Sequence, residues 1–379
     1  MHHSTETTGN GNPLTSPNAH RGSTPSVSLI RKRLRKFRSL KRGYYCFLIM
    51  SIAYLISFLL PVLISNTALI LRYEGEFYFP MLRYYPASTF GQETIVEPDY
   101  RELRQIFREQ DGGNWVLLPP YPYSPTESLL ELPGFPPHPP SSEHLFGTDD
   151  RGRDIFARLS YGFNVSMTFA VLVLVFSYAI GIIVGAALGY FGGKLDILGQ
   201  RLIEIWSSLP FLYTIIIVSS IVVPVYTPGK NLVLQPSFWL LITIMTTFGW
   251  MGITYYVRGE FYREKTKDYV GAAIAMGASD RTIMFQHILP NSLTPVVSFA
   301  PFMIVANIGA LVALDFLGFG LPVPMPSWGE LIGQGMENLT KWWLVFFPLS
   351  AMFVTLLLIV FIGEAVREAF DPKEYSRLQ

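Results

Sequence analysis

The sequence predicts an all-α membrane protein with six transmembrane helices and a long insertion after the first of them. Half of the 379 residues are hydrophobic and only 15% are charged, a balance typical of a chain with several membrane spans. Apolar runs long enough to cross a bilayer are expected at 44–66, 161–190, 202–224, 237–257, 292–318 and 342–366. Gly181, Gly185 and Gly189 lie four residues apart on the second run, which predicts close packing against another helix.

Charge and cysteine content exclude several other classes. The formal net charge is +1, so the composition indicates no binding to nucleic acid. The only cysteine, Cys46, lies in an apolar run, which excludes a disulfide framework and a cysteine metal cluster.

The tail 1–43 becomes strongly basic just before the first span, with Arg31, Lys32, Arg33, Arg35, Lys36, Arg38, Lys41 and Arg42. A basic cluster next to a span is better explained by retention of the N-terminus in the cytoplasm than by nucleic-acid binding. It is also expected to contact anionic lipid headgroups. The links 192–201 and 258–291 and the tail 367–379 then fall in the cytoplasm, and each carries Lys or Arg as the positive-inside rule requires. The links 226–236 and 321–341 fall outside.

The insertion 67–159 is rich in Tyr and Pro and is expected on the extracytoplasmic side. Its clearest helical pattern is 99–110, where Leu103, Ile106 and Phe107 share one face. We expect a small subdomain that is partly irregular. The rest of the chain, 160–366, then forms a five-helix core.

Three carboxylates, Asp149, Asp150 and Asp154, precede the second span. Two explanations are open: a metal site, or turn and N-cap chemistry at the start of a helix. The spacing lacks the Gly and the distal Glu of an EF-hand loop, which favours the turn and the N-cap. No metal site is therefore expected.

The link 258–291 contains a predicted helix–turn–helix hairpin. Asp268 begins a helix of Ala-rich composition, and Gly277 is placed to end it as a left-handed C-cap. Ser279 is a candidate N-cap of a second helix, with Asp280 in its first turn. Pro290 is expected to stop that helix.

The second helix of this hairpin is predicted to have an apolar face made by Ile283, Met284, His287 and Ile288. A short exposed apolar face at a membrane surface is typical of a docking site. The alternative is an ordinary amphipathic loop between two spans.

The hairpin resembles the EAA loop of ABC importer permeases, whose pattern is Glu-Ala-Ala, three residues, Gly, and later Ile-x-Leu-Pro. The matching residues are Ala272, Ala273, Gly277, Ile288, Leu289 and Pro290. Gly271 stands where the family often has Glu.

Three further stretches resemble the C-type permeases of dipeptide and oligopeptide ABC importers: 147–154, 315–331 and 347–373. The phrase Tyr-Tyr-Pro-Ala-Ser-Thr-Phe at 84–90 is similar to the Yej-type branch, which is associated with peptide and microcin C uptake.

The resemblance implies a type I ABC importer permease fold in the bacterial inner membrane and a role in peptide transport. It implies a second permease subunit, two cytoplasmic ATPase subunits or one fused ATPase, an extracytoplasmic solute-binding protein and a peptide substrate. ATP and Mg would be bound by the partner subunits, so this chain is expected to hold no cofactor. The implied ATPase-coupling residues are Asp268, Ala272, Ala273, Gly277, Ala278, Ser279, Asp280, Ile283, Phe285, Ile288, Leu289 and Pro290.

The chain carries no nucleotide-binding loop of the form GxxxxGK[ST], no HExxH and no GxSxG, so we expect neither a catalytic residue nor ATP hydrolysis by this subunit. An alternative class is a secondary transporter or channel without an ABC ATPase. That class predicts paired charges deep in the spans or inverted repeats, and neither is evident. A membrane-anchored receptor would not need the hairpin.

Candidate residues of a translocation path are Asn164, Asn307 and Asp315. Interhelical hydrogen bonds are the competing explanation for both asparagines. Asp315 is compatible equally with a place in the substrate vestibule and with capping of the turn at 318–320.

Overall fold

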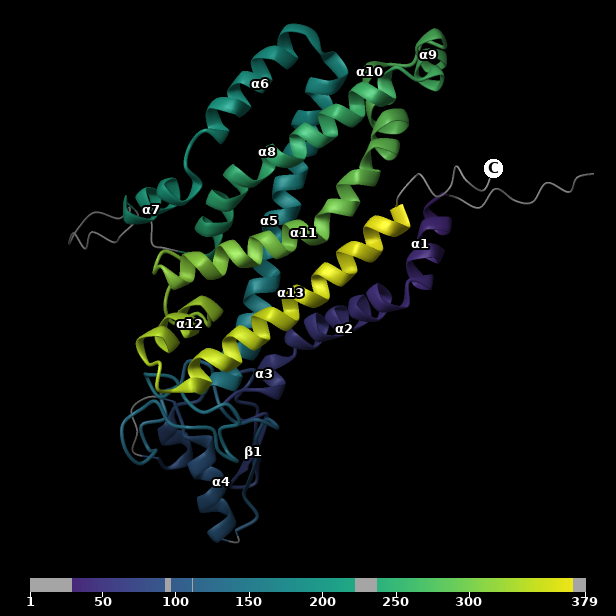
Figure 1. The fold of residues 1–379 in the computed structure, drawn as a ribbon. Helices are drawn as coiled ribbons and strands as arrows, with labels where there is room; N and C mark the ends of the chain where they lie inside the picture. The colour runs from purple at the N-terminus through teal and green to yellow at the C-terminus, as the bar shows by residue number, and fades with distance from the viewer. Residues whose placement is uncertain (1–28, 93–96, 111, 222–236, 371–379) are drawn as a thin grey trace, which may run out of the picture.

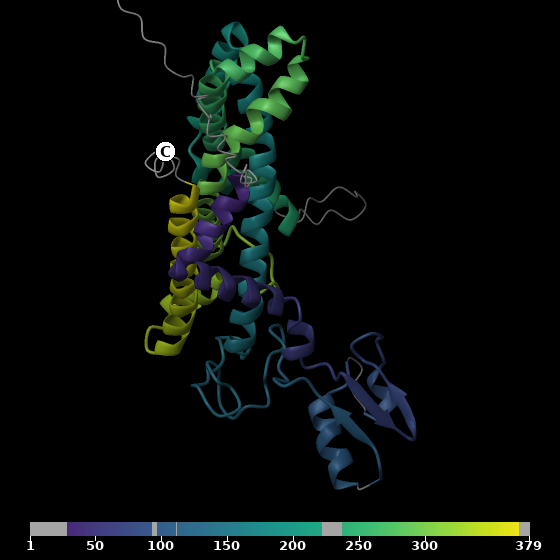
Figure 2. The ribbon, with the colours of Figure 1, turned by 90° about the vertical axis from the view of Figure 1, so that its right-hand side faces the viewer.

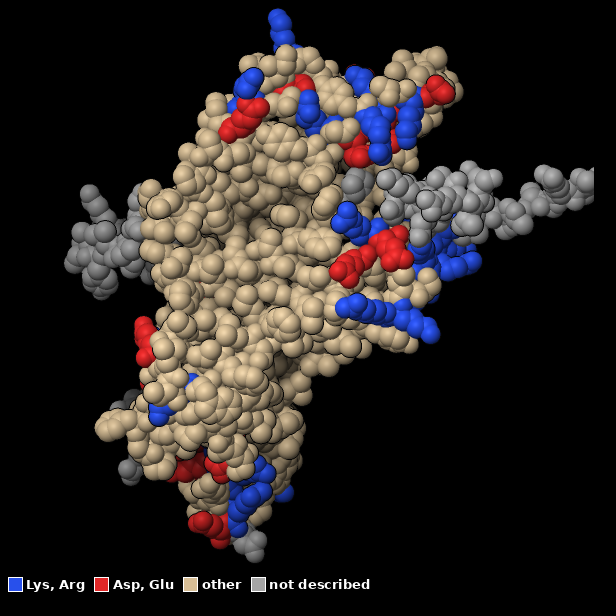
Figure 3. Space-filling view, in the orientation of Figure 1, with Lys and Arg blue, Asp and Glu red and all other residues tan. Residues whose placement is uncertain are grey.

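Four long helices dominate the computed structural model, which describes residues 29–92, 97–110, 112–221 and 237–370. Each contains a stretch that is long and apolar enough to cross a membrane, and together they form an elongated bundle (Figures 1 and 2). On the face seen in Figure 3, a broad uncharged band separates charged side chains at the two ends of the molecule. The four helices are α5 (Ile155–Phe191), α8 (Phe238–Lys265), α11 (Leu289–Phe316) and α13 (Trp342–Phe370).

The two other predicted spans are less regular. The run expected at 202–224 is a pair, α6 (Gly193–Ser207) and α7 (Phe211–Ile221), bent by 70°. The run expected at 44–66 is α2 (Lys41–Ser57), whose 17 residues reach only about 26 Å, followed by the short α3 (Leu60–Leu63).

The described residues therefore hold four candidate spans, or up to five if the bent pair is one span, and six spans are not confirmed. Residues 1–28 of the basic tail, the link 226–236 and the closing residues 371–379 lie outside the described part of the chain.

Glycines allow α5 and α8 to lie against each other, as their spacing predicted. A methyl group at Gly181 would lie 2.2 Å from Ile253 Cγ2, and one at Gly189 would lie 2.6 Å from Phe261 Cβ. Both distances are shorter than any normal carbon–carbon contact, so the two backbones are too close for a larger residue. The α5–α8 pair is thus closely packed along the glycine stripe.

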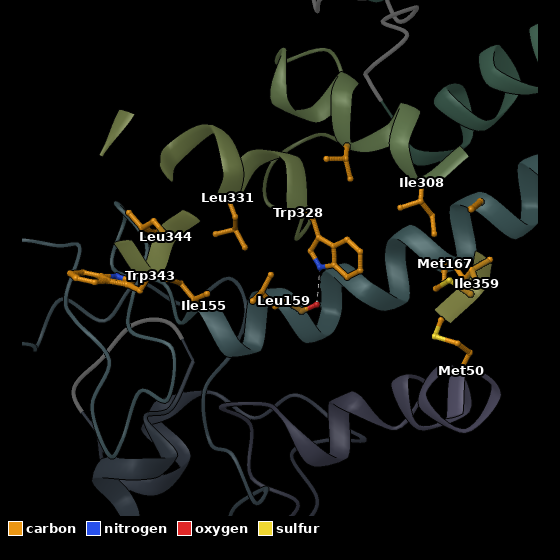
Figure 4. Close-up of a cluster of buried hydrophobic side chains, with 12 residues drawn as sticks. Met50, Ile155, Leu159, Met167, Ile308, Trp328, Leu331, Trp343, Leu344 and Ile359 are labelled. Carbon is orange, nitrogen blue, oxygen red and sulfur yellow. Dashed lines mark hydrogen bonds between the residues drawn. The ribbon is translucent and has the colours of Figure 1, made fainter. Parts of the chain in front are cut away.

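The core at the other end of α5 centres on Trp328, the first residue of α12 (Trp328–Glu337). Its indole nitrogen donates a hydrogen bond of 3.0 Å to the carbonyl oxygen of Leu159 (Figure 4). Burial of an indole is favourable when its N–H has such a partner. Around it lie side chains of α2, α5, α11 and α13, including Met50, Met167, Ile308 and Ile359. Figure 2 shows α1 (Leu29–Ser39) and α2 beside α13.

The insertion corrects the all-α prediction, because it contains a three-stranded antiparallel sheet in the order β2-β1-β3. The strands are β1 (Ile70–Tyr73), β2 (Glu76–Tyr78) and β3 (Trp115–Leu117), accompanied by the short helix η1 (Ala87–Phe90). Leu71 packs on α4 (Tyr100–Glu109), where Leu103 and Phe107 form the predicted apolar face. Asp99 caps α4 by accepting a hydrogen bond of 2.9 Å from the Arg101 amide.

Candidate functional site

The predicted hairpin exists, and its first helix is α9 (Asp268–Ala275). Gly277 follows with φ +81, the left-handed conformation that its place after the helix predicted. Its amide donates to the carbonyl oxygen of Ile274 at 2.9 Å, and the Ala278 amide donates to that of Ala273 at 3.1 Å. These two bonds form a Schellman motif, which confirms the C-cap.

The second arm differs from the prediction at its end. Ser279 caps α10 (Asp280–Thr282), accepting from the Thr282 amide at 3.3 Å, as predicted. The chain continues as the π-helical segment η2 (Ile283–Ile288) and passes directly into α11. Pro290 does not stop this helix, because it stands in the first turn of α11, where its missing N–H costs no hydrogen bond.

The prediction of an exposed face at Ile283, Met284 and Ile288 is wrong. These side chains are buried in one cluster with Val270 and Ala273, together with Tyr190 of α5 and Val257 and Phe261 of α8. The apolar surface of the hairpin lies elsewhere, on Ile274, Met276 and Phe285, which are 55%, 80% and 48% exposed.

The remaining candidate coupling residues mostly face outward. Ala278 and Leu289 are partly exposed, and the exposed ones are Asp268, Ala272, Gly277, Ser279, Asp280, Phe285 and Pro290.

Hydrogen bonds join α9 to the end of α8. The buried carboxylate of Glu264 accepts from Lys267 Nζ at 2.6 Å and from the Tyr269 hydroxyl at 2.8 Å. Burial raises the pKa of the Tyr269 phenol. The hydrogen bond that Asn291 Nδ2 donates to the phenol oxygen lowers this pKa, and the interaction with Glu264 raises it. The i,i+3 spacing of Glu264 and Lys267 was visible in the sequence, whereas the contribution of Tyr269 had no comparable signal.

A second bond joins the hairpin to the end of α5, where the Tyr190 hydroxyl donates to Asp280 Oδ1 at 2.6 Å. These residues are 90 positions apart, so sequence spacing gave no sign of the contact. Nearby, Asp196 of α6 accepts from Arg258 Nη2 at 2.7 Å and from the Tyr262 hydroxyl at 2.9 Å, which ties α6 to α8. The hairpin is therefore attached to the ends of α5 and α8, and α6 is joined to α8 close by.

The three candidate path residues have partners within the chain. Asn164 Nδ2 donates to Ser57 Oγ at 2.8 Å, and Asn307 Nδ2 donates to the carbonyl oxygen of Ala170 at 3.2 Å. Both are interhelical bonds. Asp315 accepts from the Leu321 amide at 2.6 Å, so it closes the turn after α11.

The carboxylates before α5 make the predicted turn and N-cap. Asp149 accepts from the Arg151 and Arg153 amides at 2.9 and 2.8 Å, and Asp154 caps α5 at the Ala157 amide, 2.9 Å away. Burial and the adjacent Asp149 raise the pKa of Asp150. Within the described ranges, no group of His, Cys, Asp or Glu is arranged to hold a metal ion.

A buried ionic network at this end was missed by the sequence analysis. Arg158 is fully buried, pairs with Glu330 of α12, and donates to the carbonyl oxygen of Pro125 at 3.0 Å. Arg153 Nη2 also donates to Glu330, at 3.0 Å. The network joins the insertion, α5 and α12, which lie far apart in the sequence.

Comparisons with known proteins agree on one family. Residues 177–374 match the model of the binding-protein-dependent transport system inner membrane component. The inner membrane ABC transporter permease protein YejE of Escherichia coli (strain K12) is 40% identical over 90% of this chain and 96% of its own length. The peptidoglycan transport system permease protein YejE of Agrobacterium fabrum is 35% identical over 92% and 94%. The dipeptide transport system permease protein DppC of Bacillus subtilis is 33% identical over 62% and 70%.

Proposed function

This chain belongs to the binding-protein-dependent transport system inner membrane components, and on that premise we propose that it conducts peptides as one permease subunit of an importer. As an ABC permease of the inner membrane, it relies on ATPase activity in partner subunits. The names of its dipeptide and peptidoglycan transport relatives support a peptide substrate. We include oligopeptides and microcin C-like peptide conjugates in the proposed substrate class.

We propose that the complete transporter contains a second permease, two ATPase subunits or one fused ATPase, and an extracytoplasmic solute-binding protein. In this chain, six spans are proposed, with α2 and α3 as the first and the bent α6–α7 pair as the third. The hairpin and both termini then face the cytoplasm, and the insertion faces outward. The basic side chains near α1 and α8 support this orientation.

The observation that carries the coupling role is the division of the hairpin into a buried and an exposed apolar side. The exposed side, formed by Ile274, Met276 and Phe285, is the proposed docking surface for an ATPase subunit. The buried side is attached to α8 through Glu264 and to α5 through Tyr190. A displacement of the docked ATPase would therefore move the ends of these helices.

The test replaces Met276 and Phe285 by Asp in one tagged variant. Truncation of a hot-spot residue in an interface costs about 2 kcal/mol or more, so if these two side chains anchor the docked subunit we expect at least about tenfold less ATPase subunit to co-purify. Peptide uptake should fall in parallel. The control is Phe135→Asp, an aromatic side chain of the insertion that is 97% exposed. Normal ATPase recovery and uptake by the double variant, at equal membrane levels, would refute the coupling role.

A further inference from the structure

A cavity of about 670 Å³ lies at the hairpin end of the bundle, between α1, α8, α11 and α13. Four cationic side chains from separate parts of the chain line it: Arg33, Arg263, Lys267 and Arg367. On the face shown in Figure 3, Lys and Arg side chains gather over this end of the molecule. The cavity shares Lys267 with the attachment of the hairpin, but Arg33 and Arg367 have no role in that attachment.

Two of the four positive charges are neutralised within the cavity. Lys267 pairs with Glu264 at 2.6 Å, and Arg263 pairs with Glu260. Arg33 lies 5.2 Å from the centre of the Phe370 ring, a cation–π contact that leaves its charge in place. Within the described ranges, neither Arg33 nor Arg367 has an acidic partner. Among the residues that the structure describes, the side chains of Arg33 and Arg367 thus carry positive charge into the cavity without a paired carboxylate.

Along α11 the lining of the cavity changes from polar to apolar side chains. Thr294 and Ser298 follow the basic residues, and Phe299 lies one position further along α11. The apolar stretch of α11 that is long enough to cross a membrane begins at Val296, so the cavity lies at its boundary. A ligand with an anionic group that the arginines can bind and an apolar chain that can lie beside Phe299 matches this lining.

We propose that the cavity binds the phosphate of an anionic membrane phospholipid, whose acyl chains leave along α11. The helix α1 is basic, packs through Phe37 on Ala365 and Ala369 of α13, and exposes Leu34. Because a basic helix with an exposed apolar side chain is suited to a membrane surface, its place beside the cavity favours a lipid over a soluble anion. Basic pockets between helices at the cytoplasmic membrane surface are suited to such headgroups. The bound lipid joins α1 and α13 to Lys267, where the hairpin begins.

The orientation of this cavity rests on the proposed function, but lipid binding can be measured without transport. The test compares Arg33→Gln/Arg367→Gln with Lys194→Gln/Arg201→Gln, which removes equal charge from exposed positions of α6 outside the cavity. The intact transporter is reconstituted in nanodiscs of phosphatidylcholine with phosphatidylglycerol, and retained lipid is measured by native mass spectrometry. Because a lost charge-assisted hydrogen bond weakens binding about tenfold or more, the cavity variant should retain at least about tenfold less phosphatidylglycerol than wild type.

Retention of phosphatidylglycerol by the control at the wild-type level, with its loss from the cavity variant, supports the proposal. Equal losses in both variants would overturn it in favour of general surface charge. Displacement of the lipid by millimolar inorganic phosphate would overturn it in favour of a soluble-anion site. Loss of ATPase subunits from the cavity variant without loss of lipid would identify the cavity as a protein interface instead.

Discussion

Replacement of Gly277 by Ala isolates the contribution of one backbone conformation to the hairpin. Gly277 has φ +81, and a residue with a β-carbon pays about 1–2 kcal/mol to adopt the left-handed region. A methyl group at this position would have no heavy atom within 4 Å, so a steric clash adds nothing to that cost. The Schellman bonds to Ile274 and Ala273 should therefore open more often while the membrane helices stay intact.

The matched control is the same chemical change at Gly271, inside α9. A methyl group there also has no heavy atom within 4 Å, but the backbone is helical, where Ala is favoured over Gly by about 0.5–1 kcal/mol. The two variants should thus differ by roughly 1.5–3 kcal/mol in hairpin stability, with opposite signs relative to wild type.

Hydrogen exchange measured over the hairpin provides the assay. Gly277→Ala should accelerate exchange at residues 277 and 278 about 5- to 30-fold, and Gly271→Ala should slow it. Peptide-stimulated ATPase activity of the assembled transporter should fall only in Gly277→Ala. Equal exchange rates in the two variants would refute the assignment of the C-cap as the element that holds the hairpin together.

Two further predictions concern the bundle. Gly185→Ala should lower the free energy of unfolding by about 1–3 kcal/mol, since the methyl group would lie 2.7 Å from a carbonyl oxygen of α8. The control is Gly252→Ala, whose methyl group would have no heavy atom within 4 Å, and both variants are compared by thermal unfolding of the purified protein. Glu330→Gln should cost about 1.5–3 kcal/mol, because Arg158 loses one charged partner while the buried carboxylate of Asp149, 3.5 Å away, still compensates its charge. Arg151→Gln, which removes an exposed partner 3.6 Å from Glu330, should change the unfolding temperature little, and equal shifts in both variants would contradict this reading of the network.

The features that the sequence predicted well depend on neighbouring residues. Long apolar runs specify the helices, and a Gly after α9 or a Ser or Asp before α10 and α5 specifies where they end. Gly277, Ser279 and Asp154 all make the expected caps, because each cap involves atoms within a few residues of it. The same holds for the apolar face of α4.

The features that could not be predicted from the sequence depend on contacts between residues that lie far apart along the chain. Strands of three or four residues show too little alternation to be recognised, so β1 to β3 went unpredicted. The spacing of Ile283 and Ile288 predicted an apolar face but not what covers it, and the covering residues Val257 and Phe261 belong to another span. The role of Pro290 was wrong for a related reason, since the presence of η2 makes the following turn the start of α11.

In the proposed coupling role, the attachment of the hairpin would let a small exposed surface act on several helices. Glu264 holds α9 to α8, Tyr190 holds α10 to α5, and η2 runs without a loop into α11. Because the glycine stripe lets α5 and α8 pack in close contact, a force on Met276 would act on both helices of this pair. The same force would reach α11 through η2, and the far end of α11 is joined to the start of α12 through Asp315, which accepts a hydrogen bond from Ser327. A movement at the hairpin therefore has a continuous helical route to the opposite end of the bundle.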